Sequence, residues 1–152
     1  MTSSTPASPA LSLDRTLSYR LHRLHKLSDL ESQRRYEQEV GLSMSEGRCL
    51  TAIGTFQPMS VQHLARAANL NKGQASRAAQ ALVEQGLVRK EDDASDGRGV
   101  TLTLTPQGRT VWARAIAMVH QRNSEIFGCL SPADQAQLGR LLDLLIHHNA
   151  KS

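Results

Sequence analysis

The sequence predicts a mainly α-helical protein that carries one small β-hairpin. Apolar residues recur at steps of three and four along six segments, which is the period of an amphipathic helix. The run from Val100 to Thr105 instead alternates strictly between an apolar residue and threonine, which is the period of a half-buried strand. With 152 residues, of which 39% are hydrophobic, the chain can build one compact domain with a modest core.

The N-terminal third of the chain predicts two helices. The first covers about residues 12–37, and its leucine stripe consists of Leu13, Leu17, Leu21, Leu24 and Leu27. A stripe of this length requires a large apolar partner, either within the chain or outside it. The second helix begins at Ser43, because Ser43 and Glu46 have the spacing of a capping box. Gly54 and Pro58 are expected to end it.

Two short helices follow, and each begins at a residue that caps helices well. Ser60 is the expected N-cap of the first helix. Its buried face is predicted to consist of Val61, Leu64, Ala65 and Ala68. Asn71 is the expected N-cap of the second helix. Its inner face is predicted to consist of Ala75, Ala78, Ala79 and Leu82. Gly86 suits the position after that helix, and residues 87–105 then predict a strand, an acidic loop and a second strand.

The last two predicted helices begin with the same pair of residue types. Thr105 and Ser131 each offer a hydroxyl for the N-cap, followed by proline at the first helical position. The apolar face of the first of these helices is Val111, Trp112, Ala115, Ile116 and Val119. The apolar face of the second is Leu138, Leu141, Leu142 and Leu145.

The two short helices and the tight turn between them predict a helix-turn-helix, and the β-hairpin directly after them makes it winged. In this motif the second helix enters the major groove of DNA with its N-terminal residues first. The predicted DNA contacts on this helix are Lys72, Gly73, Gln74, Ser76, Arg77 and Gln80. Gln74 can pair bidentately with adenine and Arg77 with guanine. Lys72 and Ser76 suit phosphate contacts, and Gly73 has no side chain to hold the backbone away from DNA.

The hairpin predicts a second DNA contact. Arg98 lies between Gly97 and Gly99, which let the backbone turn sharply. Its guanidinium suits the narrow, negative minor groove of A·T tracts. Asp96 is expected to pair with a nearby arginine and to fix the hairpin. The alternative is that this segment is only a soluble turn.

The distribution of charge supports a polyanionic partner. The net charge is +4, and no acidic residue occurs between Glu46 and Glu84. Such a gap predicts a surface for a polyanion, although it can also arise by chance. Aromatic residues make up only 3% of the chain, which argues against a stacking platform for single-stranded nucleic acid. Double-stranded DNA is therefore the predicted partner.

Residues of both motifs resemble the winged helix-turn-helix of MarR-type bacterial transcriptional regulators. The wing pattern of that family is matched by Asp96, Arg98, Leu104 and Thr105. Its recognition-helix pattern is matched by Ser76, Arg77, Leu82, Gly86 and Leu87. The resemblance covers about residues 11–148. At this position many relatives carry a larger residue, often arginine, where this chain has Gly99. The glycine is therefore expected to weaken the phosphate contacts at the wing tip.

The resemblance implies a homodimer that interlocks its N- and C-terminal helices and binds a pseudo-palindromic operator. It divides the chain into a disordered tail at 1–11, a helical dimerisation region at 12–40 and 106–152, and a winged helix-turn-helix DNA-binding domain at 41–105. Packing of the leucine stripes within one chain is the alternative to dimerisation.

The resemblance further implies a repressor that a small anionic or aromatic effector releases from DNA. In such relatives the effector binds in a cleft between the dimer helices and the DNA-binding lobe. The residues that could line such a cleft here are Trp112, Arg20, His25 and Arg48. Roles for these four side chains in the core or on the surface are the alternative.

Two other means of regulation are possible from the sequence. Cys129 precedes a helix start, where a thiolate is favoured, whereas Cys49 lies mid-helix and is expected to be buried and inert. Redox sensing through Cys129 or Cys49 is therefore an alternative. The histidines at 22 and 25 and at 147 and 148 are not joined by an obvious set of further ligands, so no metal and no cofactor are expected.

Other classes of protein have less support. The sequence contains no nucleophile elbow, metalloprotease motif, P-loop or dinucleotide fingerprint, so an enzyme is not expected. A winged helix that contacts protein rather than DNA is an alternative. No apolar run reaches the length of a membrane span and residues 1–10 do not resemble a signal peptide, which predicts a cytoplasmic protein that does not bind membranes.

Overall fold

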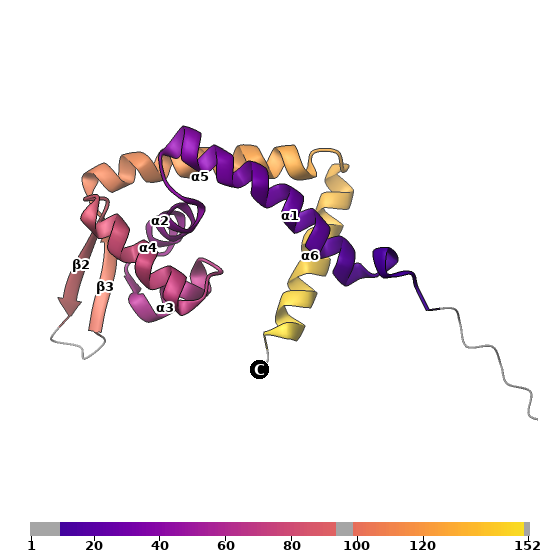
Figure 1. The fold of residues 1–152 in the computed structure, drawn as a ribbon, viewed down its shortest axis with the longest axis horizontal. Coiled ribbons are helices and arrows are strands. Elements are labelled where there is room, and N and C mark those ends of the chain that lie inside the picture. The colour runs from indigo at the N-terminus through magenta and orange to yellow at the C-terminus, as the bar shows by residue number, and fades with distance from the viewer. Residues whose placement is uncertain (1–9, 94–98, 151–152) are drawn as a thin grey trace, which may run out of the picture.

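The computed structural model describes residues 10–93 and 99–150, and it confirms the predicted fold class (Figure 1). The α-helices of these residues are α1 (Leu17–Arg35), α2 (Met44–Phe56), α3 (Val61–Ala67), α4 (Lys72–Glu84), α5 (Pro106–Phe127) and α6 (Pro132–Asn149). The strands are β1 (Met59–Ser60), β2 (Val88–Asp93) and β3 (Gly99–Leu104). Helices α3 and α4 and the β2–β3 hairpin form the winged helix-turn-helix.

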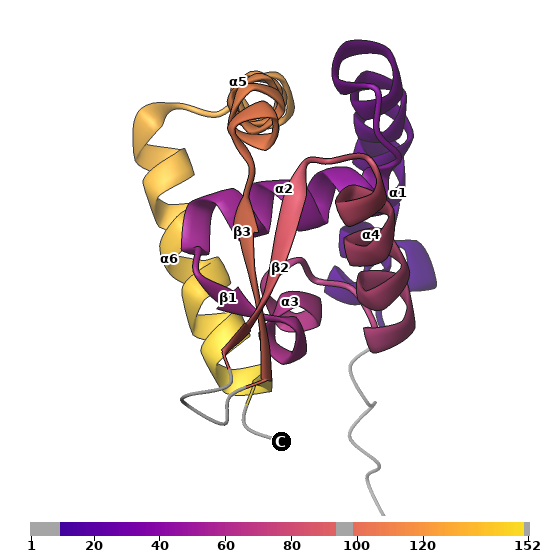
Figure 2. The same cartoon turned by 90° about the vertical axis from the view of Figure 1, so that its left-hand side faces the viewer.

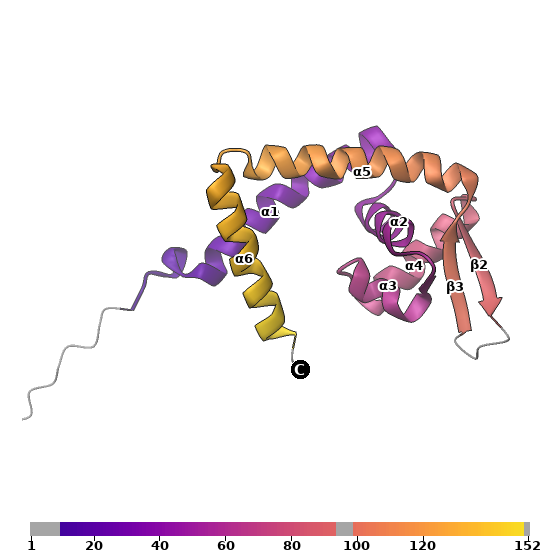
Figure 3. The same cartoon turned by 180° about the vertical axis from the view of Figure 1, so that it is seen from behind.

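The core lies in one lobe, which α2, α3, α4, the sheet and the first part of α5 form together (Figure 2). Its fully buried large side chains include Leu50, Ile53, Leu64, Leu82 and Leu102. Helix α5 runs along this lobe and carries α6 at its far end (Figure 3). Neither α1 nor α6 contains a buried residue, and Leu17 and Leu145 are 77% and 55% exposed. The alternative that both leucine stripes are buried within one chain is therefore wrong for α1, and in α6 only Leu138 and Leu142 are half-buried.

The predicted helix starts are confirmed. Ser43, Ser60, Asn71, Thr105 and Ser131 each accept a hydrogen bond from the backbone N–H three residues further on. The end of α4 is also as predicted, because Gly86 has a φ of 76° and completes a C-terminal cap in which the Leu87 N–H donates to the Leu82 carbonyl at 3.0 Å.

The first predicted helix is not continuous over residues 12–37. A short 3-10 helix at Leu13–Arg15 ends at Thr16, whose side chain then caps α1 by accepting a hydrogen bond from the Tyr19 N–H. The prediction missed this break because the leucine spacing continues across it. At the other end the chain widens into a π-helical segment, Tyr36–Val40, which brings both of its terminal side chains into the core.

Gly54 and Pro58 were both expected to end α2, and the helix ends at Phe56, before Pro58 as predicted but after Gly54. Gly54 lies under the indole of Trp112, and a Cβ at position 54 would overlap the ring. The indole N–H donates to the Thr51 carbonyl at 3.3 Å, which fixes the ring against α2. Gly54 is therefore a packing position that joins α2 to α5.

The sheet has one strand more than the sequence predicted. Its order is β1-β3-β2 and all pairs are antiparallel, with Met59 and Lys90 on either side of Leu102. Strand β1 has only two residues, which is too short for an alternating pattern to be recognised. The predicted alternation in β3 is confirmed, since Leu102 and Leu104 are buried and the intervening Thr103 is not.

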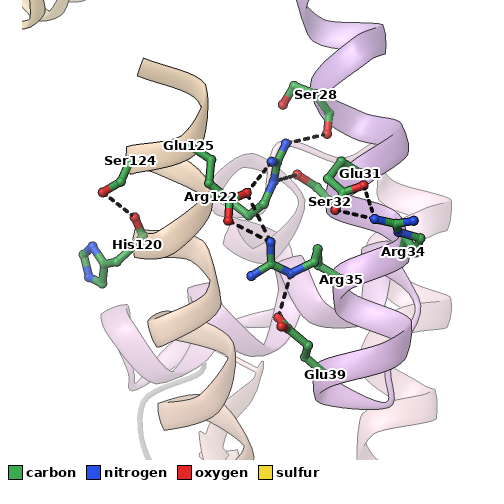
Figure 4. A network of polar contacts seen from close by, with 10 residues as sticks. All are labelled: Ser28, Glu31, Ser32, Arg34, Arg35, Glu39, His120, Arg122, Ser124 and Glu125. Atoms are coloured by element: carbon green, nitrogen blue, oxygen red, sulfur yellow. Dashed lines mark hydrogen bonds and ion pairs between the residues drawn. The ribbon is translucent and has the colours of Figure 1, made fainter. Parts of the chain in front are cut away.

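A polar network joins α1 to α5 (Figure 4). Arg122 of α5 is buried and donates to the Ser32 hydroxyl and the Ser28 carbonyl of α1, both at 3.2 Å. Arg122 also donates to Glu125 at 2.8 Å, and Arg35 of α1 donates to the same carboxylate at 2.9 Å. Hydrogen bonds from these two guanidinium groups, first Arg122 and then Arg35, hold the pKa of Glu125 below its ordinary value of 4.5.

Replacement of Glu125 by glutamine should change how stability depends on pH. Because the pKa of Glu125 is lower in the folded state, its ionised form stabilises the fold fully above the ordinary pKa, and this contribution is lost as the pH falls through the folded value. The wild type should therefore be more stable than Glu125→Gln from about pH 5 to pH 7, and the difference should shrink toward about pH 3. Urea denaturation at a series of pH values measures this. A difference that does not change with pH would contradict the prediction.

Gly54→Ala should destabilise the fold through contact with Trp112. The indole must move, and this overpacking is expected to lower the free energy of unfolding by about 1–3 kcal/mol, which outweighs the better helix propensity of alanine. Gly139→Ala in α6 is the matched control, because a Cβ there meets no described atom within 4 Å. The control should be up to about 1 kcal/mol more stable than wild type in urea denaturation. Equal effects at both positions would refute the packing role of Gly54.

Candidate nucleic-acid interface

Helix α4 presents a small buried face and a polar exposed face. Its buried residues are Ala75, Ala78, Ala79 and Leu82, as predicted. The six predicted DNA contacts on this helix are all exposed: Lys72, Gly73, Gln74, Ser76, Arg77 and Gln80. Steps of three and four place most of them on one outward face. No described part of the chain covers this edge of the helix.

Gln74 has a structural role in addition to its predicted one. It forms a capping box with Asn71: the Gln74 N–H donates to Asn71 Oδ1 at 2.8 Å, and Gln74 Oε1 accepts from the Asn71 N–H at 3.2 Å. The amide oxygen is therefore engaged, while the amide nitrogen points away from this bond. Bidentate pairing of Gln74 with adenine would have to use the second lone pair of this oxygen or open the capping bond.

Arg77 lies back along its own helix. Its Nη1 atom is 3.2 Å from the position that a Cβ on Gly73 would take. Gly73 thus leaves room for the guanidinium of Arg77 as well as for an approaching backbone. The sequence predicted only the room for an approaching backbone, because the direction of the Arg77 side chain cannot be read from spacing.

Gln80 connects α4 to the hairpin. Its amide nitrogen donates to Glu84 at 3.2 Å, and its amide oxygen accepts from Lys90 Nζ of β2 at 3.0 Å. Both polar atoms of the side chain therefore have partners within the chain. Lys90, which the sequence did not single out, keeps the hairpin beside the recognition helix.

Two grooves flank α4. The groove toward α3 has a volume of about 610 Å³ and is lined by Val61, Gln62, His63, Ala65, Arg66, Lys72, Ala75 and Ser76. Two of these side chains are cationic, and the described lining contains no carboxylate. The groove toward α2 has a volume of about 370 Å³ and is lined by Ser43, Ser45, Glu46, Gln74, Arg77, Ala78 and Ala81. Arg66 and Ser45 received no role from the sequence, although Arg66 lies in the stretch without acidic residues.

The hairpin lies beside α4 (Figure 2). Gly99 opens β3 with a φ of 75°, a conformation that favours glycine, as expected for a sharp turn. The predicted tip residues Asp96, Gly97 and Arg98 lie outside the described residues, and so does the expected ion pair of Asp96.

A cleft of about 500 Å³ lies where α1, α2, α5 and the turn after α3 meet. Its lining residues are His25, Arg48, Thr51, Ala52, Thr55, Phe56, Ala67, Ala68, Asn69, Ile116 and Val119. Of the four residues expected to line such a cleft, His25 and Arg48 do so. Trp112 instead packs on Gly54, and Arg20 lies on the exposed surface of α1.

Asp29 of α1 holds the two cleft residues that can carry positive charge. His25 Nε2 lies 2.9 Å from Asp29 Oδ2, and Arg48 Nη2 lies 3.1 Å from Asp29 Oδ1. His25 and Asp29 are one turn apart on α1, whereas Arg48 belongs to α2. The cleft therefore combines an apolar floor with a polar edge that spans two helices.

The two cysteines differ sharply in environment. Cys49 is fully buried, and burial raises the pKa of its thiol to about 12, with a smaller effect from Glu46. Its expected burial is confirmed, and a thiol with this pKa has almost no reactive thiolate near neutral pH. Cys129 is exposed in the turn between α5 and α6.

Among residues 10–93 and 99–150, no three histidine, cysteine, aspartate or glutamate side chains lie close enough to share a metal ion. None of the helices in these ranges combines the length and apolar character that crossing a bilayer requires.

The two thiols should react differently with iodoacetamide at about pH 8, because only a thiolate attacks the reagent. We expect one added group in the folded protein, on Cys129, and none in Cys129→Ser. The unfolded chain should take up a group on each cysteine. Mass spectrometry of the intact protein measures this. Rapid modification of Cys49 in the folded protein would contradict the burial of its thiol.

Several known proteins are similar to this chain. Residues 40–99 match the family model described as MarR family. The HTH-type transcriptional repressor Rv2887 of Mycobacterium tuberculosis is 28% identical over 106 residues, which are 70% of this chain and 76% of that protein. The HTH-type transcriptional regulator BilQ of Clostridium symbiosum is 27% identical over 108 residues, covering 71% of this chain and 75% of its own.

Solved structures agree with these matches. A MarR-family transcriptional regulator from Silicibacter pomeroyi has a TM-score of 0.74 at 27% identity, covering 90% of this chain and 92% of its own. The complex of Rv2887 with p-aminosalicylic acid has a TM-score of 0.68 at 27% identity, covering 86% and 98%. These relatives are transcriptional regulators and not enzymes. The chain is therefore similar to the MarR family of winged helix-turn-helix transcriptional regulators, whose family model it matches over residues 40–99.

Proposed function

We propose that the protein is a dimeric repressor that binds a pseudo-palindromic DNA operator and leaves it when a small anionic or aromatic effector binds. Each copy places α4 in a major groove and its wing in the flanking minor groove. Because its target is DNA, the protein acts in the bacterial cytoplasm. In this proposal residues 41–105 form the DNA-binding part, and residues 12–40 and 106–152 form the dimerisation part.

One observation carries the DNA-binding part of the proposal, which is the exposed polar face of α4 beside a cationic groove. Lys72 and Arg66 line the groove toward α3, where a phosphate backbone would be neutralised. Arg77 is exposed on the same helix and has the donors to read guanine. Within the proposal, Lys72, Gly73, Ser76 and Arg77 contact DNA. Gln74 and Gln80 also contact it, with amide groups that already make bonds within the chain.

The wing extends this surface. Strands β2 and β3 form an antiparallel ribbon next to α4, and the chain between them carries Arg98. A ribbon in this place brings its tip to the minor groove beside the site of α4. Arg98 as the minor-groove contact, with Asp96, Gly97 and Gly99 shaping the tip, remains part of the proposal.

Dimerisation is supported by the apolar faces that the chain leaves exposed. Large apolar side chains that are more than half exposed include Leu13, Leu17, Leu21, Leu27, Leu30, Leu144, Leu145 and Ile146. They belong to the N-terminal segment and to α6, which lie on opposite sides of the molecule in Figure 2. A second copy can cover both faces through a two-fold interface, whereas one chain cannot close them on each other.

The cleft supports an anionic effector. It offers apolar side chains from α2 and α5 together with Arg48 and His25 at its edge. A carboxylate on an aromatic ring fits this combination of apolar and cationic groups. Rv2887, which is 27% identical to this chain, has been solved in complexes with salicylic acid and with p-aminosalicylic acid.

The test uses a DNA duplex that is selected from random sequences because it binds the protein. Affinity, measured by fluorescence anisotropy, should fall linearly with the logarithm of salt concentration. Arg77→Ala should cost about 1–3 kcal/mol per half-site and relax base choice at one position. Footprints should show two protected half-sites about 10 base pairs apart.

Arg114→Ala is the matched control for Arg77→Ala. Arg114 is an exposed arginine of α5, which lies outside the winged helix-turn-helix, so its loss should leave affinity unchanged. If Arg77→Ala weakens binding equally on all DNA sequences, Arg77 contacts only phosphate. Binding that salt does not affect would refute the DNA-binding proposal.

A further inference from the structure

The polar edge of the cleft already contains a carboxylate that belongs to the protein. We propose that Asp29 competes with an anionic effector for Arg48, and that the Asp29–Arg48 ion pair is the contact that the effector opens. This inference rests on the proposed function, because it assumes that the cleft takes an anion. It assigns to Asp29 a role that controls both affinity for the effector and release of DNA.

The geometry of the ion pair makes this competition direct. Asp29 Oδ1 accepts a hydrogen bond from Arg48 Nη2 at 3.1 Å. In a guanidinium group, Nη2 belongs to both of the two-donor edges that bind a carboxylate with parallel hydrogen bonds. A ligand carboxylate that binds Arg48 in this way must therefore share or take over the nitrogen that Asp29 holds.

The electrostatics of the pair also favour competition between Asp29 and an anionic ligand. The Arg48 and Asp29 side chains are only 31% and 32% exposed, so solvent screens their attraction incompletely. Asp29 neutralises the charge of Arg48 in the free protein and lies about as close to that guanidinium as a bound ligand carboxylate would. Two carboxylates at one guanidinium repel each other, which should weaken the binding of an anion roughly tenfold.

The ion pair also joins the two parts of the chain. Asp29 belongs to α1, which has no buried residue and carries exposed leucines, whereas Arg48 belongs to α2, which contains five buried residues of the core. A hydrogen bond of 2.8 Å from Gln85 to Glu46 connects α2 to the end of α4. When an anion takes Arg48 from Asp29, α2 and α4 lose a contact that fixes them relative to α1.

The consequence for regulation follows from linkage. If the closed ion pair belongs to the arrangement that binds DNA and the open one to the arrangement that binds the anion, each ligand weakens the other by the same factor. Removal of the Asp29 charge should then act like part of the effector. It should strengthen anion binding and weaken DNA binding before any effector is added.

The test uses the full chain and its Asp29→Asn, Asp29→Glu and Glu31→Gln variants. Salicylate affinity is measured by calorimetry, and affinity for the selected duplex by anisotropy without salicylate. Asp29→Asn should bind salicylate about tenfold more tightly and DNA several-fold more weakly than wild type. Asp29→Glu keeps the charge and should restore much of both wild-type values.

Glu31→Gln is the matched control. Glu31 lies on the same helix and makes its ion pair with Arg34, at 2.8 Å, rather than with a cleft residue. Like Asp29→Asn, Glu31→Gln removes one negative charge, so it corrects for a general electrostatic effect on DNA binding. Both affinities of Glu31→Gln should stay close to those of wild type.

Several results would overturn the inference. Weaker salicylate binding by Asp29→Asn would mean that Asp29 holds Arg48 and His25 in place for the anion instead of competing with it. Unchanged DNA affinity in Asp29→Asn would remove the link between the ion pair and release. If no variant binds salicylate while all bind DNA, the effector part of the proposed function fails, and the DNA affinities alone decide whether the ion pair fixes α4.

Discussion

The close packing of α4 against the core is the constraint on which the candidate interface depends. Ala75, Ala78 and Ala79 are at most 4% exposed, and such small side chains let helix axes approach closely. Larger residues there would push α4 outward and tilt its polar face relative to the wing. Alanines bury little apolar area, so Leu82 and the caps at Asn71 and Gly86 supply much of what holds the helix. The packing of α4 on the core and the caps at its two ends thus fix the position of its exposed face.

Helix α4 also shares side-chain bonds with its neighbours, which makes it part of a larger unit. Gln80 is bonded to Lys90 of β2, and Gln85 is bonded to Glu46 of α2. The indole of Trp112 joins α2 to α5 across Gly54. A displacement of α2 is therefore passed to α4 and the wing together and is not absorbed by a single loop. In such a unit, a contact at the far side of α2 can influence the face that meets DNA.

Features with local causes can be predicted from the sequence, whereas features that depend on distant residues cannot. Caps such as Ser43 and Asn71 were predictable, because the residues that form them lie three positions apart. The exposed face of α4 followed from helical period and the burial of its alanines. Strand β1 and the packing role of Gly54 were missed, because each is defined by a partner more than 40 residues away, Leu102 in one case and Trp112 in the other. The bonds of Gln74 and Gln80 within the chain depend on side-chain direction, which no spacing encodes.

The two walls of the cleft differ in what fixes them. The wall formed by α2 and α5 belongs to the core, with Ala52 and Ala115 buried. The wall formed by α1 is attached by polar contacts. Arg122 of α5 donates to Ser32 of α1, Arg35 of α1 pairs with Glu125 of α5, and Asp29 of α1 pairs with Arg48 of α2. Because the leucines of α1 are exposed in the single chain, a second copy that covers them would also set where this wall stands. In the proposed dimer, this cleft has one wall in the core and the other on a dimer helix, so it changes shape whenever the two parts move relative to each other. In the proposed dimer, occupancy of the cleft and the spacing of the two recognition helices would then depend on the same movement, and the proposed role of the ion pair across the boundary is to sense it.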